Sequence, residues 1–481
     1  MGTPYRELDK RILGEVYGST ETMENLIVLC DEYNSRWPGS GDDRKACEFM
    51  VRKLEEYGLE DPHLESLTLP GWIRGSSKLT VTTPIQKEIP CIALPHCVEG
   101  EVESELVFLG DGPIDIYEKR RDEIEGNIVM VTSRTPLGMT RSLHRIEKFN
   151  RSILAGAEGF IFMNHYPAYG PPTGGISPII PAVGVSHEDG SFLARLLRRK
   201  GKIKVRIETR CMNPDVESWN VVADLPGSGD GKELVVYGAH YDGHDIAQGA
   251  LDDATGAVCV MEAARVLAKM EEHIKRRFRF ILFAAEEIGL FGSRAYVEQH
   301  PDEMENIRFM LNFDSAGRAG RQGFQLHGWP TLEPFFKGVA DDLGVDLPIW
   351  QRVSPYSDHW PFLLQGIPTA GMGDPEEARM RGGRGFGHTM YDTVDKVELR
   401  VHRECVGNAA VAALRIANID EWPVEHRSQE EIDELVRGQG YRETMELGER
   451  LNAYLSAKRD KLRPETKVHL QRMLGSWDEV I

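Results

Sequence analysis

Hydrophobic positions follow two different periods along the chain. Near the N-terminus, apolar residues recur at helical spacing in residues 23–33 and 46–54, and two short runs typical of strands, HLESLTLP and KLTVTT, follow. From Asn220 onward, short apolar runs such as ELVVYGAH, FRFILFAAEE and IRFMLNFD alternate with longer helical segments. This order predicts an α/β fold, a mostly parallel central sheet with helices on both faces.

The stretch between residues 91 and 211 has a different pattern. It carries short β runs, ELVFLG, NIVMV and GFIFM, together with two helical stretches, and has no candidate cluster of metal ligands. We predict a discontinuous main domain (1–90 and 212–422), an inserted smaller α+β domain (91–211) and a helical C-terminal appendage (423–481). Within the inserted part, the Pro- and Gly-rich residues 166–181 are predicted to form a long surface loop.

Composition narrows the classes of partner. The chain has 76 acidic and 57 basic residues, a net charge of -19, which repels phosphate backbones and anionic membranes. The seven cysteines are scattered and form no C-x-x-C pair, as expected of reduced thiols. The N-terminal MGTPYRELDK has no apolar core behind its charges, and no later stretch is as long as a membrane span. We therefore expect a cytoplasmic protein with neither nucleic-acid nor membrane partners.

Polar side chains follow the apolar runs where the predicted strands end, or stand in the loops beyond them. They are His240, Asp242, Asp252, Glu286, Glu287, Asp314 and His388. Taken singly, each is better explained as a helix cap, a strand end or a solvated turn than as a metal ligand. Carboxyl ends of parallel strands meet at one edge of a sheet, however, and imidazole with carboxylates suits a divalent ion such as zinc. Their joint placement predicts a metal site, with one of the two adjacent glutamates left for proton transfer.

The order of these residues resembles that of the co-catalytic zinc metallopeptidases of clan MH, which include bacterial leucyl aminopeptidase and glutamate carboxypeptidases. The resemblance extends over nearly the whole chain. DIAQGALDD, HLESLTLPGWIRG and an inserted segment similar to the protease-associated domain bring the chain nearest to the carboxypeptidase Q branch. SDHWPFLLQGIPTAG, which contains Asp358 and His359, is similar to another family block beside the active site. These two residues are therefore candidates for substrate contact.

The resemblance implies a two-metal site in which Asp252 bridges two Zn²⁺ ions. His240 and Asp314 would complete one of the two sites. Glu287 and His388 would complete the other. Other divalent ions such as Co²⁺ or Mn²⁺ could replace zinc.

The same resemblance implies the chemistry of the remaining residues. Glu286 would be the general base, and Asp242 would orient a histidine ligand, His240. Two zinc ions would supply a bound hydroxide to attack the peptide carbonyl, and Glu286 would take the proton of the water and return it to the leaving amine. The implied activity is the removal of terminal residues from short peptides.

Two positions depart from the family pattern. Gly243 stands where members often carry Ser or Thr, and an additional His244 lies near the site, either as an incidental polar residue or as a contact for substrate or metal.

Arg381 and Arg384 lie in the loop MRGGRGFGH, where a guanidinium could bind a free substrate carboxylate. A flexible basic surface loop explains these arginines equally well.

Several activities remain open from the sequence. The first expectation is an aminopeptidase, in which acidic residues near the metals hold the substrate ammonium. A carboxylate clamp would instead give a dipeptidase or carboxypeptidase. Two alternatives belong to other functional classes. One is a transferase like the one-zinc glutaminyl cyclases, and the other is a non-catalytic binding protein like the transferrin-receptor relatives. The C-terminal helices are compatible with a homo-oligomer.

Overall fold

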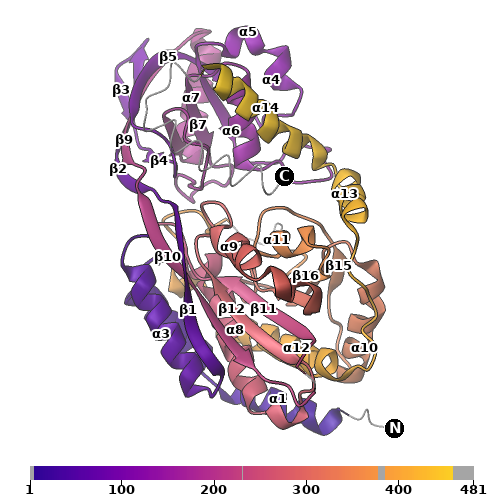
Figure 1. The fold of residues 1–481 in the computed structure, drawn as a ribbon. Helices are drawn as coiled ribbons and strands as arrows, with labels where there is room; N and C mark the ends of the chain where they lie inside the picture. The colour runs from indigo at the N-terminus through magenta and orange to yellow at the C-terminus, as the bar shows by residue number, and fades with distance from the viewer. Residues whose placement is uncertain (1–4, 230, 377–384, 459–481) are drawn as a thin grey trace. The chain divides into compact units, whose positions relative to one another are not determined.

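The computed structural model describes residues 5–229, 231–376 and 385–458, which form two compact units (Figure 1). The first, called the core unit below, comprises residues 1–69, 217–387 and 392–435. The second, called the inserted unit, comprises residues 70–216, 388–391 and 436–481. Each unit contains an eight-stranded sheet.

The sheet of the core unit is mostly parallel. Its strands, in spatial order, are β1 (Glu60–Pro70), β10 (Asp215–Leu225), β12 (Arg277–Phe283), β11 (Leu234–His240), β13 (Ile307–Asn312), β16 (Thr369–Gly373), β14 (Gly323–Leu326) and β15 (Ile349–Gln351). The central strand β11 pairs in parallel with both β12 and β13, and β13 pairs in parallel with β16. β10 and β14 run antiparallel to β12 and β16. This arrangement confirms the fold class predicted from the alternating runs.

Helices cover both faces of this sheet, which explains why β11 is buried throughout and apolar up to its last residue, His240. On one face, Val236 and Phe283 pack with Tyr296 of α9 (Phe291–Gln299) and Phe362 of α11 (His359–Leu364). On the other face, α8 (Thr255–Ala268) contacts β11 and β12, and the Tyr237 hydroxyl donates to the Ala409 carbonyl of α12 (Leu399–Asn418) at 3.0 Å. Strands buried on both faces lose the usual alternation of apolar and polar residues.

The remaining helices of the core unit surround this framework. They are α1 (Arg6–Gly18), α2 (Glu21–Asp31), α3 (Asp42–Glu56) and α10 (Glu333–Leu343), while α13 (Gln429–Gly438) continues into the second unit. Short helical turns are η1 (Ala250–Ala254), η2 (Glu271–His273), η3 (Pro301–Asn306), η4 (Pro330–Leu332) and η6 (Val394–Lys396). Of these, η1 leads directly into α8 and carries Asp252.

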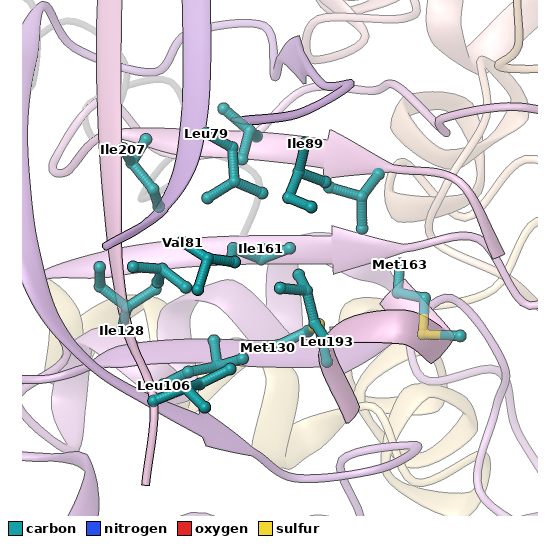
Figure 2. Close-up of a cluster of buried hydrophobic side chains, with 14 of the residues drawn as sticks. Leu79, Val81, Ile89, Leu106, Ile128, Met130, Ile161, Met163, Leu193 and Ile207 are labelled. Atoms are coloured by element: carbon teal, nitrogen blue, oxygen red, sulfur yellow. The ribbon is translucent and has the colours of Figure 1, made fainter. Parts of the chain in front are cut away.

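The inserted unit combines helices with a sheet that is part antiparallel and part parallel. Its strands, in spatial order, are β3 (Lys87–Ile89), β2 (Ile73–Thr83), β9 (Lys204–Met212), β5 (Gly100–Phe108), β6 (Ile128–Thr132), β7 (Gly159–Met163), β8 (Ala182–Val185) and β4 (Ile92–Ala93). Its helices are α4 (Ile116–Lys119), α5 (Arg121–Ile124), α6 (Arg145–Leu154), α7 (His187–Lys200) and α14 (Arg442–Lys458). Figure 2 shows the apolar core of this unit, where Val81, Ile161 and Leu193 are buried. The predicted loop, residues 166–181, lies between β7 and β8.

The inserted unit includes more of the chain than residues 91–211, the segment that the hydrophobic pattern predicted as an inserted domain. β2 and β3 precede Cys91 but belong to this sheet, because β2 pairs along its length with β9. Part of the C-terminal segment also clusters with this unit: on α14, Glu443 lies 3.5 Å from Arg151 and the Thr444 hydroxyl donates to Glu147 at 3.3 Å. The division into independent domains and the protease-associated character of the insert stay predictions.

The structure bears on the predictions about membrane-spanning segments and about the cysteines. Within residues 5–229, 231–376 and 385–458, no helix combines the length and hydropathy needed to span a membrane. All seven cysteines are free thiols, and the sulfur atoms of Cys97 and Cys211 lie 3.7 Å apart.

Candidate metal centre

The carboxyl ends of three adjacent parallel strands place the predicted ligands of the core unit. His240 is the last residue of β11, and Asp314 lies two residues beyond β13. Asp252 comes from η1, in the connection between β11 and α8. The candidate ligand atoms of these three residues all lie within 4.8 Å of one another. Strand order therefore brings together side chains that are up to 74 positions apart in sequence.

The donor set at this point fits a zinc ion. His240 Nε2 is buried and makes no hydrogen bond within the described part of the chain, while its Nδ1 lies 3.0 Å from the Asp242 carbonyl oxygen. If Nδ1–H donates to that carbonyl, Nε2 carries the lone pair that a metal requires. Nε2 lies 3.6 Å from Asp252 Oδ1 and 4.0 Å from Glu286 Oε2. One imidazole and two carboxylates are typical ligands of Zn²⁺.

The charges around His240 also favour a cation. Burial alone lowers the pKa of this imidazole, but the nearby carboxylates, led by Glu286, outweigh burial and raise the pKa well above its ordinary value. For Glu286, burial raises the pKa of the carboxyl; His240 opposes that rise, and Glu287 and Asp314 add to it. A buried cluster of carboxylates is thus stabilised by any positive charge that enters it.

Asp242 connects the ends of two strands. Its carboxylate accepts hydrogen bonds from the backbone N–H groups of Glu286 at 3.0 Å and Glu287 at 3.3 Å. Its Oδ1 also lies 3.5 Å from His240 Nδ1. The carboxylate predicted to orient His240 therefore also fixes the backbone that carries the two adjacent glutamates.

His244 contacts one of these glutamates. Its Nε2 lies 2.9 Å from Glu287 Oε2, both side chains are buried, and its ring lies 5.7 Å from the ring of Trp37. The extra histidine is thus next to a predicted metal ligand.

His388 belongs to the inserted unit, where its Nδ1 lies 3.3 Å from both the Thr173 carbonyl oxygen and Arg145 Nη1. The predicted role of His388 as a metal ligand stays a prediction.

The candidates for substrate contact lie in different surroundings. Asp358 and His359 are both buried, and burial raises the pKa of Asp358 to about 7 and lowers that of His359 to about 4. The His359 ring stacks on His327 with 3.7 Å between centroids, and its Nε2 lies 2.9 Å from the Ser354 carbonyl oxygen. Their contact with substrate stays a prediction. Arg381 and Arg384 lie outside the described residues.

Two residues at the centre were missed by the sequence analysis. Asp392 is buried and accepts hydrogen bonds from the backbone N–H groups of Leu251 at 2.6 Å and Asp252 at 3.1 Å. Arg318 is also buried, and its Nη2 donates to the carboxylates of Asp252 and Asp314. No local pattern in the sequence marked either residue, because both lie in loops.

A third missed residue, Arg36, fixes the connection that carries Asp252. Its side chain is fully buried, and its guanidinium donates to the carbonyl oxygens of Leu29, Asn34, Tyr241, Gln248 and Gly249. Three of these carbonyls belong to the loop between His240 and η1. Nothing in the run RWPGSGD indicated that this arginine would be buried.

Comparison with known proteins identifies this architecture. Residues 220–413 match the model of peptidase family M28. Carboxypeptidase Q of Mus musculus is 26% identical over 446 residues, which cover 87% of this chain and 90% of the mouse protein. A peptidase M28 precursor from Shewanella amazonensis has the same fold, with a TM-score of 0.73, 23% identity and coverage of 88% of this chain and 98% of that one. The zinc aminopeptidase BSAP from Bacillus subtilis aligns with a TM-score of 0.65 and 21% identity, over 85% of this chain and 98% of that one. Residues 220–413 are therefore similar to peptidase family M28 of clan MH, and the comparisons support a metallopeptidase, a hydrolase of peptides.

Proposed function

We propose that the protein is an aminopeptidase that removes residues from short peptides with two zinc ions and Glu286 as general base. The observation that carries this proposal is the convergence of His240, Asp252 and Asp314, with Glu286 Oε2 4.0 Å from His240 Nε2. Zinc ions bound at this centre would polarise the peptide carbonyl and lower the pKa of water.

The residues around this cluster have separate tasks in the proposal. Glu286 is not one of the three clustered donors, and its backbone is held by Asp242. Its carboxylate takes the proton of the attacking water and gives it to the leaving amine. A carboxyl whose pKa is raised by burial is suited to hold that proton between the two steps.

Glu287 and His388, together with Asp252, would hold a second ion. The likeness to clan MH supports this assignment, as does the chemistry of the donors. Glu287 lies beside His244, whose imidazole could serve as an additional donor. The number of ions is therefore the first quantity to measure.

A carboxypeptidase or dipeptidase is the second candidate. The likeness to mouse carboxypeptidase Q, over 87% of this chain, favours it. Acidic residues around the metals favour the aminopeptidase, since a carboxylate that holds no ion attracts a substrate ammonium. In the aminopeptidase the substrate amine must be free, whereas in a carboxypeptidase the carboxylate must be.

The test combines metal analysis with matched dipeptides. The purified protein is treated with a chelator, reloaded with Zn²⁺ and assayed with Leu-Gly, its N-acetylated form and its C-terminal amide. An aminopeptidase cleaves the amide and spares the acetylated peptide. If the acetylated peptide is cleaved and the amide is not, the proposal is replaced by the carboxypeptidase. A requirement for both free ends would replace it with a dipeptidase. A zinc content below two ions per active chain would contradict the two-ion site.

A further inference from the structure

Arg318 places a positive charge inside the candidate metal cluster. It lies between β13 and β14, and its side chain is 3% exposed. Its Nη2 donates both to Asp252 Oδ1 and, at 2.8 Å, to Asp314 Oδ1. The same nitrogen lies 3.7 Å from Asp253 Oδ1. A single guanidinium nitrogen thus contacts both carboxylates of the cluster.

This contact has a consequence for any ion that binds there. Hydrogen bonds between charged groups are strong, and they occupy the acceptor oxygens that a metal would use. A metal ion bound by the same two carboxylates would lie close to the guanidinium in a buried place, where like charges repel strongly. The ion and Arg318 therefore compete for Asp252 and Asp314.

We propose that Arg318 is an internal counter-ion of the cluster that must release at least one carboxylate before a metal ion binds. The inference rests on the proposed function, because it assumes that His240, Asp252 and Asp314 hold an ion. Before the ion binds, Arg318 offsets the repulsion among three neighbouring aspartates, including Asp253. It thereby stabilises the metal-free protein and lowers the metal affinity of this cluster.

Arg318 could instead support metal binding, and the effect of removing it on metal affinity would then have the opposite sign. If the guanidinium served to orient Asp252 and Asp314 as ligands, its removal would weaken metal binding, as loss of a supporting hydrogen bond does in other metal sites. If it competes with the ion, its removal tightens metal binding. The direction of the change in affinity therefore separates the two roles.

The test uses the full-length chain stripped of metal. Co²⁺ binding is followed by its visible absorption, and Zn²⁺ binding by competition with a coloured chelator. We expect Arg318→Gln to bind the ions at least tenfold more tightly than wild type, and its metal-free form to melt at a lower temperature. Arg321→Gln is the matched control, because Arg321 is half exposed and pairs with Asp346 at 3.0 Å. Equal or weaker ion binding by Arg318→Gln would overturn the inference.

A second variant covers the case in which metal-free Arg318→Gln does not fold. Arg318→Lys keeps the charge but lacks the branched guanidinium, so it should bind ions more tightly than wild type; equal affinity would overturn the inference. Asp252→Ala tests the metal site separately from the role of Arg318. If Asp252→Ala binds ions as wild type does, the proposed metal site is wrong. If Asp252→Ala loses an ion while both Arg318 variants match wild type, only the role of Arg318 is wrong.

Discussion

The carboxylate of Asp242 accepts a hydrogen bond from the backbone N–H of Glu286 at 3.0 Å. Its other oxygen accepts one from Glu287 at 3.3 Å. The end of β11 is thereby tied to the segment that follows β12, and the two adjacent glutamates are held although their charges repel. Asp242 supports both the histidine ligand and the proposed base.

Asp242→Asn should weaken the centre without removing a ligand. The amide keeps one acceptor oxygen but turns an NH₂ group toward a backbone N–H, so one buried donor loses its acceptor. We expect a loss of about 1–3 kcal/mol in the free energy of unfolding and zinc binding weakened by about 10–100-fold. Denaturant unfolding and metal competition measure the two effects. Asp302→Asn, at an exposed site, is the control, and an unchanged zinc affinity in Asp242→Asn would argue against the supporting role.

Glu286→Gln should separate catalysis from metal binding. Glutamine has the same shape but cannot accept the proton of the attacking water. We expect kcat to fall by about 10²–10⁴-fold while the zinc content stays at the wild-type level. Steady-state kinetics and elemental analysis of the same preparation give both values. Glu287→Gln is the comparison and should lose metal; loss of zinc from Glu286→Gln would instead make Glu286 a ligand.

Arg36→Met should destabilise the core unit through the loop that carries Asp252. The guanidinium donates to five backbone carbonyls, and methionine leaves them without these donors. Because each buried polar group that loses its partner costs about 1–3 kcal/mol, we expect a total loss on the order of 3 kcal/mol or more. Arg36→Lys should recover part of this loss, since an ammonium has three donors. Arg52→Met, at an exposed position of α3, serves as the control for urea denaturation.

The sequence was sufficient for those parts of the centre that local pattern determines. β11, β12 and β13 are apolar runs, and parallel pairing of such runs necessarily gathers the residues at their carboxyl ends. His240 and Asp314 could therefore be predicted together. Arg318 and Asp392 could not, because their contacts join loops whose approach depends on the packed structure. The extent of the inserted unit was missed for a similar reason: β2 pairs with β9, more than 100 residues later.

The last prediction concerns Lys148, which lies in α6 of the inserted unit. Its side chain is fully buried and donates to the Thr132 carbonyl oxygen at 2.8 Å and the Arg134 carbonyl oxygen at 2.6 Å. Burial lowers the pKa of Lys148 from 10.5 to about 8, although Asp111 and Glu147 oppose the change. The unfolded chain therefore binds this proton more tightly than the folded one. Between pH 8 and 10.5, the contribution of Lys148 to the free energy of unfolding must rise with pH.

Lys148→Met removes this titration, so the two proteins should respond differently to alkaline pH. The free energy of unfolding of wild type minus that of the variant should increase by an amount on the order of 3 kcal/mol between neutral pH and pH 10.5. Thermal and urea unfolding at several pH values measure the difference, and subtracting the variant removes the contribution of other titrating groups. Lys202→Met is the control, because Lys202 is exposed and pairs with Glu105 at 2.9 Å. Parallel profiles for wild type and Lys148→Met would mean that the pKa of Lys148 is not lowered, since only a difference in proton affinity between the folded and unfolded states produces such a slope.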